Sequence, residues 1–131
     1  MNQMPSDVTL LRLAVQNLAA APQAQRRYVQ LNLMRRAIGN LDRVGARAAE
    51  LRDSGELDAE QARLVAELRE EVLRQMSADP DFLSEADSGA REFLFGNALE
   101  TDGWIRVRGL ARPCYTALAG EESPFIALRA K

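Results

Sequence analysis

Four carboxylate side chains that could act as a general acid and a general base lie close together in the segment 79–87. Two carboxyl groups can share this work when burial or a neighbouring charge separates their pKa values. The surrounding pattern is that of a linker, which would leave these acids solvated, and they lack the alternating ligands and the closing Glu of a calcium-binding loop. We interpret the segment as an exposed acidic surface, formed by Asp79, Asp81, Glu85 and Asp87.

The chain contains no histidine, and Cys114 is its only cysteine. Zinc sites of the Cys/His type and Ser-His-Asp or Cys-His catalytic groups are therefore excluded within this chain. Arg112 is the only basic residue close to Cys114 in sequence, so we interpret Cys114 as a buried structural thiol. We expect a non-catalytic protein without a metal or a cofactor. An enzyme that uses carboxylates and arginine alone stays open as a third class.

Arginine is concentrated in the segment 22–52, which holds seven arginines and two acidic residues. If this segment is helical, four polar side chains share one ridge, and Arg and Asn are side chains that contact phosphates and base edges. The net charge of −2 opposes nucleic-acid binding, and Glu50 lies within one turn of the last arginine of the ridge. We therefore keep nucleic-acid binding as the alternative to a solvated or protein-binding face, with the ridge formed by Arg36, Asn40, Arg43 and Arg47.

The charge of the chain changes sign along the sequence. The segment 53–102 holds fourteen acidic residues against four arginines, and it directly follows the basic segment 22–52. Two interpretations are open: the blocks pack against each other inside the fold, or they present opposite charges to different partners. We favour the internal interpretation, because consecutive helices usually pack together.

Helices are the elements that we expect to position these side chains, since the helix formers Ala, Leu and Arg recur through the amino-terminal part of the chain. A length of 131 residues is typical of one domain. The first helix begins at Ser6 or Asp7, either of which can cap it, and ends near Ala20. Its apolar face repeats at three and four residues through Val8, Leu11, Val15 and Leu18.

The segment 22–53 carries a nearly continuous apolar stripe of helical period. As one unbroken helix it would be about 48 Å long, whereas a compact chain of this length is about 36 Å across. Either the helix bends at Gly39 and Asn40, or it projects and offers its stripe to another chain. Because the phase of the stripe continues across the glycines, we predict a continuous or gently kinked helix. The stripe is formed by Leu31, Met34, Ile38, Leu41, Ala48 and Leu51.

A turn and a new helix follow this stripe. Gly55 can take the left-handed conformation that ends helices, and Asp58 with Gln61 fits a capping box. We therefore predict an antiparallel hairpin of the segments 22–53 and 58–77. Its sequence LRDSGELDAEQARLVAEL resembles the small helical hairpin that many bacterial proteins carry at their ends, and the resemblance implies an oligomerisation element.

The segment 79–131 is less regular than the helical bundle that we predict for 1–78. Residues 104–108 alternate as Trp-Ile-Arg-Val-Arg, which predicts a strand, and residues 125–128 predict a second strand that could pair with it. Short helices are expected at 89–99 and 113–119.

Trp104 is the only tryptophan of the chain. We interpret it as part of a small carboxy-terminal core. The alternative is a partner-binding patch of Trp104 with Arg106 or Arg108, since Trp and Arg are enriched at binding hot spots.

Together these patterns predict a mainly α-helical single domain, 1–131, that works by non-catalytic protein–protein interaction or regulation. We expect a protein partner, with self-association as a homodimer or larger homo-oligomer. A lone cysteine forms no internal disulfide, and neither a secretory signal nor a membrane-spanning run is evident, so we expect a cytoplasmic location and no membrane partner. The expected protein-binding residues are Leu31, Met34, Ile38, Leu41, Trp104 and Arg106.

Overall fold

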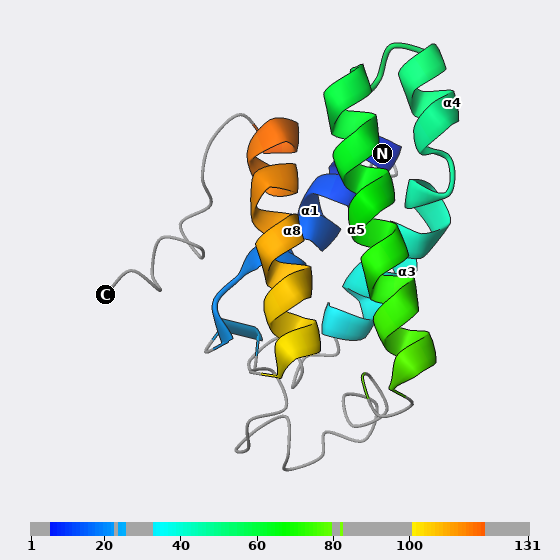
Figure 1. Cartoon of the computed structure of the whole chain (residues 1–131). Coiled ribbons are helices and arrows are strands. Elements are labelled where there is room, and N and C mark those ends of the chain that lie inside the picture. Colours follow the sequence, from blue (N-terminus) through cyan, green and yellow to red (C-terminus); the bar gives the residue numbers. More distant parts are fainter. Residues whose placement is uncertain (1–5, 23, 26–32, 80–81, 83–100, 120–131) are drawn as a thin grey trace.

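Most residues that the computed structural model describes are α-helical (Figure 1), and the described residues are 6–22, 24–25, 33–79, 82 and 101–119. This confirms the predicted mainly α-helical fold over that part of the chain. None of the helices there is both long and apolar enough to cross a membrane. The helices are α1 (Asp7–Ala19), α3 (Leu33–Gly45), α4 (Ala48–Asp53), α5 (Ala59–Ala78) and α8 (Asp102–Ala119).

Helix α1 begins as the sequence predicts. The hydroxyl of Ser6 accepts a 3.1 Å hydrogen bond from the amide nitrogen of Thr9, which satisfies one of the donors left open at a helix start. Leu11, Val15 and Leu18 of the predicted apolar face are fully buried. The face with a helical repeat is therefore the face that packs on the core.

Hydrogen bonds of polar side chains connect the carboxyl end of α1 to α8. The fully buried Gln25 donates a 3.0 Å hydrogen bond to the carbonyl of Leu18, and its Oε1 accepts a 2.8 Å hydrogen bond from the guanidinium of Arg108. Nε of Arg112 donates to the carbonyl of Ala19 at 3.2 Å. Carbonyls left open by the end of the helix thus gain donors, and cationic side chains lie at the negative end of the helix dipole.

The segment 22–53 is not one helix, because α3 ends at Gly45 and α4 begins at Ala48. The prediction of a continuous or gently kinked helix is therefore wrong, and the break does not lie at Gly39, which is inside α3. At Gly45 helix α5 comes close, since a Cβ there would lie 3.2 Å from Cδ of Arg69. The break also removes the conflict of length, because the 13 residues of α3 span only about 20 Å.

The turn between α4 and α5 follows the sequence prediction. Gly55 has a φ of 86°, in the left-handed region where a side chain is unfavourable. Asp58 and Gln61 form both hydrogen bonds of the capping box, each 2.8 Å long. Figure 1 shows α5 running back alongside α4 and α3, so the predicted antiparallel hairpin is confirmed.

Residues 104–108 are helical and form the first turns of α8, so the strand predicted there is wrong. Trp104, Val107 and Ala111 are buried at the three- and four-residue spacing of a helix. Ile105 is 53% exposed, so Ile105 and Val107 do not share one face as they would in a strand. An alternation of five residues was too short to distinguish the two periods.

Helix α8 continues through Pro113, where the sequence predicts the start of a separate short helix. A proline inside a helix removes one backbone hydrogen bond, and burial of Cys114 and Leu118 beyond it offsets this cost. The second predicted strand, at 125–128, and the predicted helix at 89–99 lie outside the described residues.

One hydrophobic core joins all five of these helices. Trp104 is 1% exposed, and its ring stacks on that of Phe82 with the centroids 4.4 Å apart, in agreement with its interpretation as a core residue. A Cβ on Gly103 would lie 2.5 Å from Oε1 of Gln75, so a larger residue at this position would displace the end of that side chain.

Candidate functional site

The apolar stripe of α3 is used inside the chain. Met34, Ile38 and Leu41 are at most 4% exposed, because α1 and α5 both pack against α3. Leu31 lies outside the described residues. The stripe is thus covered by helices of the same chain at these three positions. This corrects the prediction that the stripe is offered to another chain. It also removes the observation on which the expected self-association was based.

The predicted patch of Trp104 with Arg106 or Arg108 is not present on the surface. Trp104 and Arg108 are buried, and Arg108 is bonded to Gln25. Arg106 alone of these three is exposed. The patch would require the alternating geometry of a strand. In a helix Trp104 and Arg108, four residues apart, share the buried face, and Arg106 points away from it.

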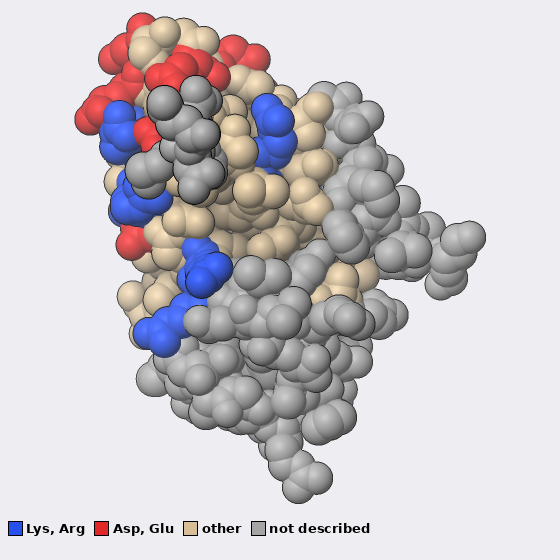
Figure 2. All heavy atoms as spheres, turned by 180° about the vertical axis from the view of Figure 1, so that it is seen from behind, with Lys and Arg blue, Asp and Glu red and all other residues tan. Residues whose placement is uncertain are grey.

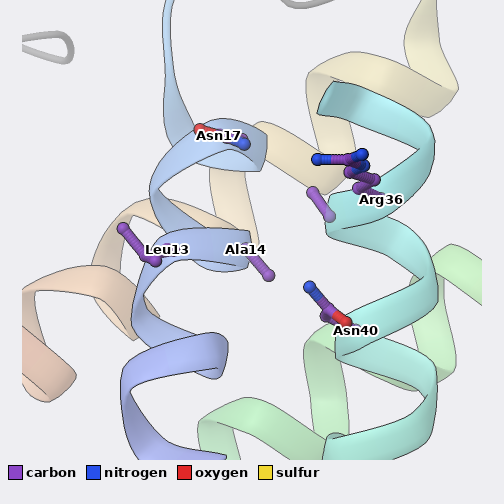
Figure 3. A pocket seen from close by; sticks show the side chains of 6 residues that line it. Leu13, Ala14, Asn17, Arg36 and Asn40 are labelled. Atoms are coloured by element: carbon purple, nitrogen blue, oxygen red, sulfur yellow. The ribbon is translucent and has the colours of Figure 1, made fainter. Parts of the chain in front are cut away.

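A hollow of about 310 Å³ lies on the surface between α1 and α3, and we call it the α1–α3 groove (Figure 3). Ala14 and Ala37 are each 2% exposed, and their small side chains leave space that larger residues would fill. Leu13 is 52% exposed and forms an apolar edge. The groove is lined by Leu13, Ala14 and Asn17 of α1 and by Arg36, Ala37 and Asn40 of α3.

The polar side of this groove comes from the predicted arginine ridge. Figure 3 shows Arg36 and Asn40 projecting from α3 toward α1. Arg43 lies one turn further along α3, and its Nη2 donates a 3.3 Å hydrogen bond to Oδ1 of Asn40. Within the described part of the chain, neither Arg36 nor Arg43 forms an ion pair. Because none of the described residues that line the groove is a carboxylate, they leave its positive charge unneutralised.

Arg47, the fourth residue of the predicted ridge, is engaged within the fold. It forms ion pairs with Asp7 and with Glu50, the latter at 3.2 Å. The carboxylates of Glu50 and Asp7 raise the pKa of Arg47, and they neutralise its charge. Glu50, which the sequence places within one turn of Arg47, thus pairs with it, and the structure adds Asp7 of α1. The open ridge therefore consists of Arg36, Asn40 and Arg43.

Acidic and basic side chains occupy different regions of the face drawn in Figure 2. Figure 2 shows acidic side chains gathered at one end and basic side chains below them. The acidic end includes the α4–α5 turn, where Asp53 and Glu56 are exposed. A described ion pair between the two blocks joins Arg69 of the acidic block to Asp42 of the basic block, at 2.9 Å. Helix α5 of the acidic block packs against α3 and α4 of the basic block, so the described parts of the two blocks lie against each other, as the favoured interpretation predicts. The Arg69–Asp42 pair leaves the excess charge of each block in place.

Two smaller hollows offer less to a ligand. One of about 180 Å³ lies between α3 and α5, beside the half-exposed Met76 and the carboxylate of Asp42, which is already paired with Arg69. The other, of about 230 Å³, lies between α4 and α5 and is lined mainly by alanine. Its Arg63 is paired with Glu60 at 2.7 Å. Neither hollow combines a large exposed apolar side chain with an arginine that has no partner within the described residues, as the α1–α3 groove does with Leu13 and Arg36.

The other residues whose side chains could react or bind a metal ion do not form a reactive site in the described part of the chain. Cys114 is fully buried, and burial raises the pKa of its thiol to about 12, so the thiol stays neutral near pH 7. Asp79 is exposed, and the other three acids of the segment 79–87 lie outside the described residues. No group of three or more His, Cys, Asp or Glu placed to hold a metal ion occurs among the residues described.

Sequence reasoning found the α3 side of the groove and missed the α1 side. Leu13 lies off the repeat formed by Leu11, Val15 and Leu18, and a large apolar residue outside the buried face was an available signal. Asn17 gave no signal of its own, because its role depends on which helix packs beside α1.

Comparisons of the chain with protein-family models, with curated proteins and with solved structures find no match.

Proposed function

We propose that this chain is a non-catalytic, cytoplasmic protein-binding module whose partner binds in the α1–α3 groove. The observation that carries the proposal is the half-exposed Leu13 beside Arg36, whose guanidinium has no ion pair in the described part of the chain. Burial of the apolar side chain supplies binding free energy, and arginine, which is enriched at interfaces, supplies orientation. The Leu, Ala, Asn and Arg side chains of the lining include no nucleophile and no general base suited to neutral pH.

The groove predicts a partner segment with acidic and apolar side chains. A carboxylate can accept two parallel hydrogen bonds from the guanidinium of Arg36. The carboxamides of Asn17 and Asn40 can bond to the backbone of the same segment. An apolar partner side chain would cover Leu13, and burial of its exposed half would contribute about 1 kcal/mol.

Nucleic-acid binding is the second candidate, and the exposed ridge of Arg36, Asn40 and Arg43 favours it. Two observations weigh against it. Arg47, which would extend the ridge, is neutralised by two carboxylates, and the net charge of the chain is −2. Nucleic-acid affinity depends on neutralising several phosphates, whereas one or two carboxylates of a protein partner match the two open guanidinium groups.

A photo-crosslinking amino acid at position 13, introduced in the native host, tests the proposal. Because Leu13 is half exposed, its replacement should leave the core intact. We expect protein adducts that survive nuclease treatment and that are lost when Arg36→Glu reverses the charge of the groove. The same probe at Thr116, exposed on α8, is the matched control. Adducts that nuclease removes would support the nucleic-acid candidate, and equal protein adducts at both positions would contradict a specific groove.

A further inference from the structure

We infer that the α1–α3 groove accepts the acidic turn of a second copy of this chain, where the acidic turn is the segment 53–58 between α4 and α5. This inference rests on the proposed function, because it names one partner for the same groove. The carboxylates of Asp53 and Glu56 would pair with the guanidinium groups of Arg36 and Arg43. Each side of this contact supplies the charge that the other lacks.

The conformation of the acidic turn is fixed before it meets a partner. Gly55 fixes the reversal of the chain in its left-handed conformation, and the capping box of Asp58 fixes the start of α5. The hydroxyl of Ser54 lies 2.9 Å from a carboxylate oxygen of Glu56 and donates to it, which orients that side chain. A preorganised turn loses little conformational entropy on binding. The absence of a side chain on Gly55 also lets the backbone approach a neighbouring surface closely.

The carboxylates of this turn are largely available to a partner. The side chain of Asp53 is 76% exposed, and its contact with Arg52 is a long one, at 3.7 Å. Glu56 is exposed and forms no ion pair within the described residues. On the receiving side, Arg36 and Arg43 lie two turns apart on one ridge of α3, about 10 Å along the helix axis. Asp53 and Glu56 on one side and Arg36 and Arg43 on the other can therefore form two pairs of opposite charge.

The acidic turn cannot fill the groove of its own copy. It lies at the far end of α4, while Arg36 is near the opposite end of α3, and the packed hairpin holds the two apart (Figure 1). Each copy offers one groove and one turn, so two copies either pair reciprocally, with each turn in the groove of the other, or join head to tail into a ring or a larger assembly. Neither arrangement uses the buried stripe of α3.

Charge exchange between two variants tests this inference. Sedimentation velocity at tens to hundreds of micromolar and low salt should show association of the unmodified chain that is lost at high salt. The groove variant Arg36→Glu/Arg43→Glu and the turn variant Asp53→Arg/Glu56→Arg should each be monomeric alone. An equimolar mixture should associate again, because both of its contacts join opposite charges. Matched controls, Arg106→Glu and Glu70→Arg, change exposed charges elsewhere and should leave association unchanged.

A crosslink in the purified chain locates the contact directly. With the photo-crosslinker at position 13 in one isotopically labelled copy, adducts should join it to the unlabelled tryptic peptide 53–63, which contains the acidic turn. Circular dichroism of each variant checks that it is folded. If a charge-reversal variant is not folded, the neutral substitutions Arg36→Gln and Glu56→Gln should each weaken association.

A chain that stays monomeric at these concentrations, a mixture that does not associate, or adducts to other peptides would overturn the inference. These results would leave the proposed function standing if position 13 still captures a different protein in the host. Conversely, if the groove captures no protein other than a second copy, the inference holds and the wider proposal is reduced to self-recognition.

Discussion

At the scale of single residues, Cys114 shows how burial sets chemistry. The side chain is fully buried in α8, and burial raises the pKa of the thiol from 9.0 to about 12. In the unfolded chain the thiol titrates near its ordinary value. Between pH 9 and 12 the unfolded state therefore loses a proton that the folded state retains. The contribution of the neutral thiol to the unfolding free energy is complete below pH 9 and is lost as the pH rises toward 12.

We predict that the unfolding free energy of the natural chain falls more steeply from pH 9 to pH 11 than that of Cys114→Ala, as measured by urea denaturation. Because the two chains are otherwise identical, the difference between their slopes isolates the contribution of this thiol. The native thiol should also react slowly with a disulfide reagent at pH 8 and quickly once urea unfolds the chain. Identical pH slopes in the two proteins, or fast reaction of the native thiol, would contradict the assignment.

At the scale of elements, two glycines of the hairpin have opposite roles. Gly39 lies on the exposed side of α3, and a Cβ there would meet no atom within 4 Å. Gly39→Ala should therefore stabilise the fold by about 1 kcal/mol, which is the difference in helix propensity. Gly55 has a φ of 86°, so Gly55→Ala should destabilise the fold by about 1–2 kcal/mol.

Urea unfolding of the two variants, followed by circular dichroism, checks both signs. The midpoint should rise for Gly39→Ala and fall for Gly55→Ala, with the slope of the transition unchanged. A lower midpoint for Gly39→Ala would show that this glycine has a role that packing does not reveal, such as a bend of α3.

The elements that could be predicted from the sequence are those with local causes. Ser6, Gly55 and Asp58 end or begin helices through contacts within a few residues, and these signals can be read directly. The break after Gly45 lies where α5 comes close, and the apolar phase on either side of the break continues. Residues 104–108 form a helix because of their packing on α1 and α5, which a five-residue pattern does not encode.

At the scale of the whole molecule, the candidate site depends on which helices become neighbours. The predicted ridge supplied Arg36, Asn40 and Arg43, but a ridge alone does not define a groove. The α1 side of the groove, with Leu13 and Asn17, exists because α1 packs along α3. A pattern of one helix predicts which side chains it exposes, whereas the partner helix determines what lies beside them.

The packing of α8 has the same long-range character. Arg108 bonds to Gln25, 83 residues away in sequence, and Nε2 of Gln61 in α5 donates to the carbonyl of Ala117 at 2.9 Å. These contacts join the carboxy-terminal helix both to the amino-terminal helix and to the hairpin. Together with the shared core, they predict that the helices unfold in one cooperative transition.

Trp104 permits a direct test of this cooperativity, because it is the only tryptophan and is buried against Phe82. Its fluorescence reports the packing of α8, while far-ultraviolet circular dichroism reports all helices together. We expect the two urea transitions to coincide. Gln25→Ala should lower both midpoints equally, by about 1–3 kcal/mol in unfolding free energy, because it removes a buried hydrogen-bond partner of Arg108 and of the α1 carbonyls. A fluorescence transition at lower urea than the circular dichroism transition would instead mean that α8 detaches before α3, α4 and α5 unfold, and that the core does not act as one unit.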